Sequence, residues 1–220
     1  MAESFNVLVT GGTGYVGQQL IVALLARGHR VRALARQSSI ARVPAGATAV
    51  AGDALNADSV AAAVKSGDTL VHLVGTPHPS PAKAKEFQQV DLPSIRATVA
   101  AAQRAKISHL VYVSVAQPAP VMRAFIEVRA AGEVMIREAQ LTATVLRPWY
   151  ILGPGHWWPL ILLPLYKITE LLPSTRESAQ RLGLVTIKQM VQALVGAVEN
   201  PPAPGTIRIV DVPAIQRGGR

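Results

Sequence analysis

Residues 5–17 of the chain read FNVLVTGGTGYVG, and this stretch decides the fold. The largely apolar run 6–9 predicts a short strand, residues 10–14 predict a turn, and Tyr15 begins a predicted helix. The N-terminus of a helix presents unpaired N–H groups and the positive end of the helix dipole. A strand, a glycine-rich turn and a helix in this order therefore predict a loop that binds phosphate groups.

The glycines of this loop have separate expected roles. Gly11 and Gly12 permit backbone angles that a side chain forbids, so they allow the tight turn. Gly14 lets the main chain approach a pyrophosphate, and Gly17 lets the helix pack closely on its strand. The pattern Gly12-x-Gly14-x-x-Gly17 follows a strand and opens a helix, and this context supports it. The alternative is a tight turn that binds no ligand.

Strand and helix patterns alternate along the rest of the chain. Further strands are predicted at 30–35, 47–51, 68–74, 109–115, 142–146 and 206–210, and further helices at 57–64, 87–102, 121–139 and 185–199. This alternation predicts parallel strands joined by helices. We therefore predict one doubly wound α/β domain over residues 1–220, in which residues 148–200 contribute a small, apolar substrate lobe.

The segment Thr10-Gly11-x-x-Gly14-x-x-Gly17 resembles the short-chain dehydrogenase/reductase superfamily, especially its atypical branch. That branch includes NmrA-like proteins, NAD(P)H-binding quinone or flavin reductases, and the dehydrogenase-like accessory subunit of respiratory complex I. The resemblance extends from about Ser4 to about Val210. It implies a parallel Rossmann sheet that binds NAD(P), with cofactor contacts in the loop at Gly11, Thr13, Gly14, Tyr15, Val16 and Gly17.

The second predicted strand indicates which coenzyme is preferred. NAD-preferring Rossmann proteins place an acidic residue near the end of this strand, where it binds the ribose hydroxyls. This segment carries Arg32 and Arg36 and no carboxylate. A guanidinium can bind a 2′-phosphate through two hydrogen bonds, and Arg36 stands where many atypical reductases keep an arginine for that purpose. We expect NADP in preference to NAD; the alternative is that both arginines are solvated charges at the strand end.

The resemblance implies further cofactor contacts near the ends of the other strands. Asp53 resembles the aspartate that accepts a hydrogen bond from the adenine amino group; the alternative is a helix cap, a role that Asn56 or Asp58 would fill better. Gly75 matches a strand end that leaves little room beside the ribose, whereas His72 is expected to be a packed strand residue. The implied contacts are Gly52, Asp53, Leu73, Val74, Gly75, Arg129, Pro148 and Trp149.

The expected catalytic positions depart from the family pattern. Short-chain dehydrogenases use a serine at the end of the fifth strand and a Tyr-x-x-x-Lys pair, in which the lysine lowers the tyrosine pKa for proton transfer. Ser114 matches the serine, but Phe125 and Arg129 replace the pair. Phe125 has no exchangeable proton, and Arg129 stays charged, so it can only hold ribose or phosphate. Ser114 and Arg129 remain the catalytic candidates, with Glu127, Tyr150 and His156 as loose candidates for a proton source.

Composition excludes several other classes of function. The chain has 220 residues and no cysteine, so disulfides, thiolate metal sites and a cysteine nucleophile are excluded. Five histidines show no paired ligand spacing, so no metal site is expected. The net charge of +9 comes from dispersed residues, which does not favour nucleic acid as a partner. The N-terminus lacks the pattern of a signal peptide, so we expect a cytoplasmic protein, with peripheral membrane contact as a further option.

Residues 157–173, WWPLILLPLYKITELLP, form the most apolar stretch. The stretch is too short and too interrupted to span a bilayer. It could be a lid over an apolar substrate, an interface with a protein partner, a surface resting on lipid, or an ordinary pocket wall.

These observations favour an NADPH-dependent oxidoreductase that acts on an apolar acceptor such as a quinone. The alternative is a non-catalytic redox sensor or accessory subunit that holds the dinucleotide, which the replacement of the Tyr-x-x-x-Lys pair supports. An epimerase or dehydratase of nucleotide sugars is less expected, because the tyrosine is missing and the C-terminal part is small.

Overall fold

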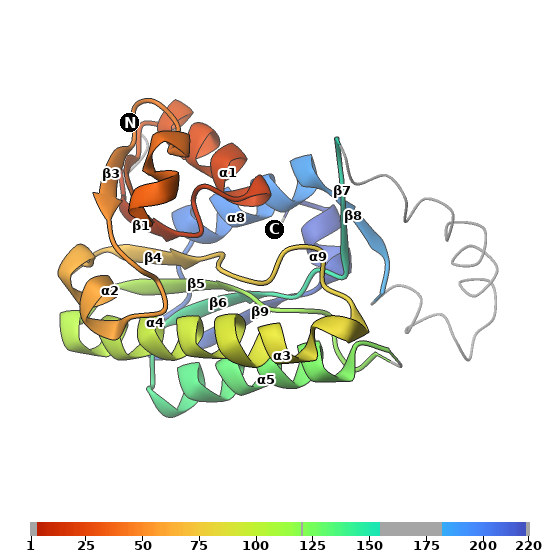
Figure 1. The fold of residues 1–220 in the computed structure, drawn as a ribbon. Helices are drawn as coiled ribbons and strands as arrows, with labels where there is room; N and C mark the ends of the chain where they lie inside the picture. Colours follow the sequence, from red (N-terminus) through yellow and green to blue (C-terminus); the bar gives the residue numbers. More distant parts are fainter. Residues whose placement is uncertain (1–3, 120, 155–181, 219–220) are drawn as a thin grey trace.

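The computed structural model describes residues 4–119, 121–154 and 182–218. Its centre is a seven-stranded parallel sheet in the order β3-β2-β1-β4-β5-β6-β9 (Figure 1). The strands are β1 (Asn6–Thr10), β2 (Arg30–Ala35), β3 (Thr48–Ala51), β4 (Thr69–His72), β5 (His109–Val113), β6 (Ala143–Leu146) and β9 (Ile207–Val210). The order reverses between β1 and β4, and this reversal opens a crevice at the carboxyl ends of those strands. The predicted doubly wound Rossmann sheet is confirmed.

Helices cover both faces of the sheet (Figure 1). One face carries α2 (Ala57–Ala63), α4 (Leu92–Ala105) and α5 (Arg123–Glu138); the other carries α1 (Tyr15–Ala26), α8 (Ile187–Glu199) and α9 (Val212–Gln216). Because both faces are covered, the central strands are apolar almost without interruption. Val7, Leu8 and Val9 of β1, for example, are all fully buried.

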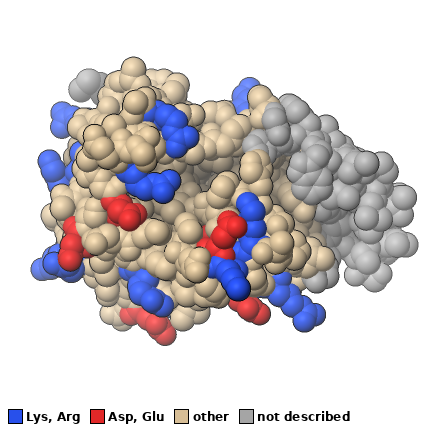
Figure 2. Space-filling model, in the orientation of Figure 1, with Lys and Arg blue, Asp and Glu red and all other residues tan. Residues whose placement is uncertain are grey.

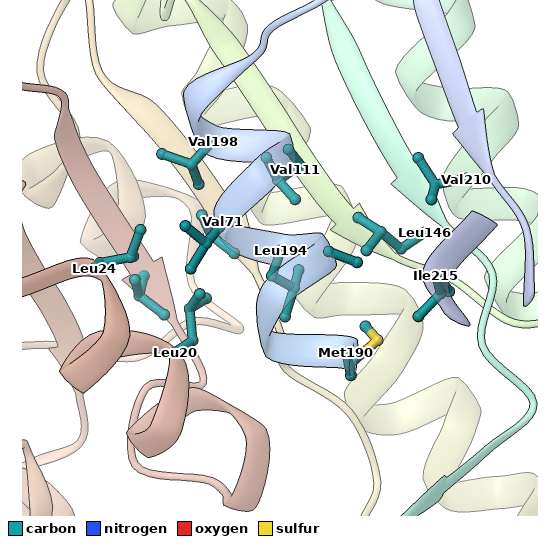
Figure 3. Close-up of a cluster of buried hydrophobic side chains, with 14 of the residues drawn as sticks. Leu20, Leu24, Val71, Val111, Leu146, Met190, Leu194, Val198, Val210 and Ile215 are labelled. Carbon is teal, nitrogen blue, oxygen red and sulfur yellow. The ribbon is translucent and has the colours of Figure 1, made fainter. Parts of the chain in front are cut away.

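The core therefore has two parts, one on each side of the sheet. On the α8 side, Leu194 of α8 packs in one cluster with Leu20 of α1 and with Val71 and Val111 of neighbouring strands (Figure 3). On the α4 side, the cluster contains Leu8, Ile95, Leu110, Tyr112 and Ile136. Helices α4 and α5 pack against each other there. This contact brings Arg129 of α5 next to Asp91, which lies just before α4.

Helix α4 contains Pro93 and is preceded by two shorter helical segments. Pro93 lies in the first turn of α4, and the helical backbone of the preceding turn continues directly into it. A short helix α3 (Ala84–Glu86) and a π-helical turn, Phe87–Asp91, precede it. The π-helical turn places Asp91 in the interior, where its side chain is 1% exposed.

The last long helix begins two residues later than predicted. Residues 184–186 form β8 (Leu184–Thr186), which pairs in parallel with β7 (Tyr150–Leu152) in a separate two-stranded sheet. Thr186 then caps α8 by accepting a hydrogen bond from the Gln189 N–H, in a reciprocal capping box. Residues 155–181 of the predicted substrate lobe, including His156 and the apolar stretch 157–173, lie outside the described residues.

Charged groups are scattered over the surface. On the face shown in Figure 2, Lys and Arg are separated by neutral surface and interspersed with Asp and Glu. In the described part of the chain, no helix combines the length and the apolarity that crossing a membrane requires.

Candidate functional site

The glycine loop between β1 and α1 is packed too tightly for side chains. Gly11 has a φ of +76°, and a Cβ there would lie 2.8 Å from the carbonyl carbon of Leu73. A Cβ on Gly17 would overlap the carbonyl oxygen of Gly11, so this glycine lets α1 approach the loop itself. Gly12 does not have a positive φ; a Cβ there would lie 2.8 Å from the terminal methyl group of Ile21, so a side chain at this position would have to displace Ile21.

The start of α1 is open to an anion. Gly14 is exposed and caps the helix without a side-chain hydrogen bond, and the first turn carries no acidic residue. Its first N–H groups, on Tyr15, Val16 and Gly17, have no acceptor within the helix. A negative ligand placed there would meet the main chain and the helix dipole without competition from an acidic side chain of the first turn.

The two arginines of the β2 region have different surroundings. The guanidinium of Arg32 already has partners in the protein, because it donates to Asp68 and to the carbonyl of Ala63. Arg36 follows directly after β2 and is exposed. Of these two guanidinium groups, that of Arg36 can therefore meet a phosphate without giving up an ion pair.

Asp53 lies just beyond the end of β3 and is exposed. One of its carboxylate oxygens accepts from the Leu55 N–H at 3.0 Å, and the second oxygen takes no part in that turn. Helix α2 is capped by Asn56, whose side chain accepts from the Ser59 N–H at 2.9 Å. Asp53 is therefore not the cap of α2, in agreement with the sequence-based preference for Asn56.

A cavity of about 420 Å³ opens at the carboxyl ends of β4, β5 and β6, next to the glycine loop. It brings together nine of the predicted site residues: Tyr15, Val16, Leu73, Gly75, Ser114, Phe125, Arg129, Pro148 and Trp149. Arg36, Gly52 and Asp53 do not line it, since they belong to the ends of β2 and β3 on the other side of the loop. The candidate site therefore has a largely apolar cavity at the ends of β4, β5 and β6, and the polar side chains of Arg36 and Asp53 at the ends of β2 and β3.

Arg129 lines the cavity, but its guanidinium is held by the protein. Nη2 lies 2.6 Å from Oδ1 of Asp91, and Nη1 donates to the carbonyl of Val113 at 2.9 Å. Nη2 also donates to the carbonyl of Val74 at 3.3 Å, so the guanidinium joins the ends of β4 and β5. A Cβ on Gly75 would overlap Nη2, so a side chain at position 75 would push the Arg129 guanidinium away from its partners.

Ser114 is bonded to an acid that sequence reasoning did not select. Its hydroxyl donates to Oε1 of Glu133 at 2.6 Å, and both side chains are buried. The same carboxylate accepts from Gln117 Nε2 at 2.9 Å and forms an ion pair with Arg147. A sequence signal for Glu133 did exist, because it lies four residues after Arg129 and hence on the same helical face.

Aromatic rings form one wall of the cavity. The ring of Phe125 lies against that of Phe87, with centroids 4.9 Å apart, and the Arg129 guanidinium lies 5.1 Å from the Phe125 centroid. Trp149 and Tyr150, which also line the cavity, meet edge to face. Phe125 therefore contributes apolar surface at the position where the family pattern has a proton donor.

His72 is a structural residue, as expected. It is fully buried, and its Nδ1 is within hydrogen-bond distance of the hydroxyls of Thr10 and Thr98, at 3.0 and 2.9 Å. Burial, assisted by the charge of Arg129, lowers the pKa of His72 to about 3, so the ring is neutral at physiological pH.

The loose candidates for a proton source are in different places. Tyr150 lines the cavity, and burial raises the pKa of its hydroxyl, so it keeps its proton at neutral pH. Glu127 is exposed on α5 and does not line the cavity. Among the described residues, no group of three or more His, Asp or Glu side chains is placed to hold a metal ion.

Comparison with known proteins gives the site a context. A family model described as NAD(P)H-binding matches residues 11–154. The chain is 26% identical over 216 residues to a ceramide reductase of Caulobacter vibrioides, covering 97% of this chain and 66% of that protein. It is 35% identical over 115 residues to a 3-beta-hydroxysteroid dehydrogenase of Mycolicibacterium neoaurum, covering 50% of this chain and 31% of that protein. The chain thus spans between about a third and about two thirds of these relatives.

Solved structures share the fold over nearly the whole chain. A dTDP-glucose 4,6-dehydratase from Streptomyces venezuelae, solved with NAD bound, has a TM-score of 0.69 at 20% identity and covers 93% of this chain and 75% of its own. A UDP-N-acetylglucosamine 4-epimerase from Bacillus cereus has a TM-score of 0.69 at 19% identity and covers 94% of this chain and 78% of its own. At these identities the likeness shows the fold alone.

Proposed function

Because this chain belongs to the NAD(P)H-binding family, we propose that it is an NADPH-dependent oxidoreductase acting on an apolar, quinone-like acceptor. The observation that carries the proposal is the cavity of about 420 Å³ beside the glycine loop. Apolar side chains of Leu73, Val113, Phe125 and Ile151 line it, together with Trp149. Such a surface favours an apolar ligand, because burying apolar area against it is favourable.

The residues of the loop fit a dinucleotide. We assign the pyrophosphate to the main chain of Gly11, Thr13 and Gly14 and to the open first turn of α1 at Tyr15, Val16 and Gly17. The tight packing of Gly11 and Gly17 and the uncapped helix start support this assignment. When bound, the reduced coenzyme supplies a hydride.

We assign the two ends of the coenzyme from the exposure and polarity of the residues on either side of the glycine loop. We place the adenosine part at Gly52 and Asp53, with the 2′-phosphate on Arg36, because these groups are exposed or partly exposed beyond β2 and β3. We place the nicotinamide part against the strand ends and the aromatic wall. That end consists of Leu73, Val74, Gly75, Pro148 and Trp149.

Arg129 and Tyr150 receive different tasks in this proposal. Asp91 compensates the charge of Arg129, so we assign Arg129 to positioning the ends of β4 and β5 beneath the coenzyme. Tyr150 keeps its proton at neutral pH and lines the cavity, so it can donate that proton to a reduced acceptor. Solvent is the alternative proton source.

A non-catalytic NAD(P)H sensor or accessory subunit is the second candidate. One specific observation favours it: Phe125 cannot transfer a proton, and the neighbouring cation is already paired with Asp91. In this candidate the cavity holds a part of a protein partner or a ligand that is not reduced.

Coenzyme consumption separates the two candidates. NADPH and NADH are first titrated into the purified chain by calorimetry, and NADPH oxidation is then followed with a panel of quinones, flavins and aldehydes. Oxidation above the acceptor-free background, with apolar quinones fastest, supports the oxidoreductase. Tight binding of NADPH with no oxidation by any acceptor supports the sensor, and absence of binding by either coenzyme would refute both.

A further inference from the structure

The hydrogen bond between Ser114 and Glu133 has a determined direction. A serine hydroxyl carries one proton and two acceptor lone pairs, whereas an ionised carboxylate can only accept. Both oxygens of Glu133 already accept from the guanidinium of Arg147, Nε bonding to Oε1 and Nη2 to Oε2. At 2.6 Å between Ser114 Oγ and Glu133 Oε1, the proton of the serine is therefore directed at Glu133.

The other donors around Glu133 fix the carboxylate in place. Gln117 Nε2 donates to Oε1 at 2.9 Å, and Arg147 donates through Nε to Oε1 at 3.0 Å and through Nη2 to Oε2. The Glu133 side chain is 6% exposed and that of Arg147 is 26% exposed, so most of the carboxylate's surroundings are these protein partners. A carboxylate with three other donor contacts thus accepts the hydroxyl proton of Ser114. Hydrogen bonds to charged groups are stronger than those between neutral groups.

Ser114 nevertheless lines the cavity. A ligand carbonyl placed there would need the proton that Glu133 holds, so forming one hydrogen bond would break a stronger one. A ligand hydroxyl or amide N–H would instead donate to a lone pair of Ser114 and leave the bond to Glu133 intact. The pair therefore discriminates between two forms of the same compound.

We propose that Glu133 is a positioning residue that makes Ser114 an acceptor, so that this site binds an apolar alcohol or hydroquinone in preference to the matching ketone or quinone. The inference rests on the proposed function for the claim that the cavity takes an apolar substrate. It assigns Ser114 a role opposite to that of a carbonyl-polarising donor. The hydroxyl-bearing reduced form is then the tighter ligand, and its accumulation inhibits the reduction.

Binding of a matched pair of probes tests this inference without turnover. Calorimetry or ligand-observed NMR measures the dissociation constants of 2-tetralol and 2-tetralone in the presence of saturating 2′-phospho-ADP-ribose. This coenzyme fragment occupies the loop but carries no nicotinamide, so neither probe reacts. We expect the alcohol to bind about three to ten times more tightly than the ketone, which corresponds to one net hydrogen bond.

Two variants locate the preference. Ser114→Ala should bring the two dissociation constants within about twofold of each other, since one hydrogen bond accounts for the difference. Glu133→Gln should weaken or reverse the preference, because the amide N–H can donate to Ser114 and release its proton. Ser108→Ala, which removes a serine bonded to the carbonyls of Gly67 and Asp68, is the matched control and should leave the ratio unchanged.

Three results would overturn the inference. They are equal affinity or a ketone preference in the unmodified chain, an alcohol preference that survives Ser114→Ala, and absence of binding by both probes at millimolar concentration. If Glu133→Gln fails to fold, Ser114→Ala still decides the question. The proposed function fails separately, when NADPH is not bound or not oxidised, because the probe ratio is measured without hydride transfer.

Discussion

The guanidinium of Arg129 and the carboxylate of Asp91 form an ion pair with 2.6 Å between Nη2 and Oδ1, and both side chains are buried. The residues come from neighbouring elements, α5 and the turn before α4, which pack against each other. Asp91 also accepts from the N–H and the hydroxyl of Thr76, at 3.0 and 2.7 Å. Asp91, just before α4, thus binds both Arg129 of α5 and Thr76 of the segment after β4.

Removing the acid from this pair should be costly. Asp91→Ala leaves the guanidinium of Arg129 buried without compensation, and we expect a loss of about 3–5 kcal/mol in the free energy of unfolding. Urea denaturation of the purified variant measures the loss. Asp58→Ala is the matched control, because Asp58 pairs with Arg104 at the surface with both side chains mostly exposed, and it should change stability little. A small effect of Asp91→Ala would mean that Arg129 finds another partner or reaches solvent.

The fit of the glycine loop can be tested at Gly17. Gly17→Ala places a Cβ on the carbonyl oxygen of Gly11, so α1 must move away from the loop. We expect a loss of about 1–3 kcal/mol in stability, typical of overpacking, and loss of coenzyme binding in calorimetry.

The control for Gly17 is a glycine with room around it. A Cβ on Gly196 in α8 would lie 3.6 Å from the carbonyl oxygen of Gly218, an ordinary contact. Gly196→Ala should leave coenzyme binding unchanged and stabilise the chain by about 0.5–1 kcal/mol, since alanine is the better helix former. Unchanged coenzyme binding in Gly17→Ala would refute the role given to the loop.

The coenzyme preference is expected to depend on Arg36. Arg36→Ala should weaken NADPH binding about tenfold, because a charge-assisted hydrogen bond to the 2′-phosphate is lost, and should leave NADH binding nearly unchanged. Arg30→Ala removes the same charge from the other end of β2 and is the control. Titrations of both coenzymes at one salt concentration make the comparison. Equal affinity for NADPH and NADH in the unmodified chain contradicts the assignment.

Two buried histidines should make stability depend on pH. Burial lowers the pKa of His72 to about 3 and that of His109 to about 4. Below about pH 6.5 the unfolded chain binds protons at these rings while the folded chain does not, so the free energy of unfolding falls as the pH falls. Well below that pH, each ring contributes about 1.4 kcal/mol per pH unit, until its folded pKa is reached.

Chemical denaturation between pH 5 and pH 8 measures this slope. Between about pH 6 and pH 5, His72→Asn should reduce the change in the free energy of unfolding per pH unit. The reduction should correspond to one bound proton, because one titrating ring is gone. Above about pH 7.5 the unfolded histidine is neutral as well, so variant and unmodified chain should show the same slope there. An unchanged slope in the acidic range would mean that His72 becomes protonated in the folded chain.

The sequence alone determined the order and type of most elements and the position of the glycine loop. These features are local: apolar runs of strand length, helical periodicity, and glycines between them depend on residues close together in the chain. Arg36 could be singled out for the same reason, since its place after β2 follows from counting along one strand. Short elements were missed, among them β7 and α9, whose formation depends on what they pack against.

The tertiary structure decided what the charged groups in the site do. From the sequence, Arg129 was a candidate to hold the coenzyme and Ser114 a candidate for catalysis, and Asp91 and Glu133 had no assigned role. The partner of Arg129 lies 38 residues away and that of Ser114 lies 19 residues away. The spacing of Glu133 from Arg129 places both on one helical face, but it does not indicate that Glu133 meets Ser114. A buried charge takes its partner from whichever element packs against it, and here the packing of α5 against α4 and β5 made that choice.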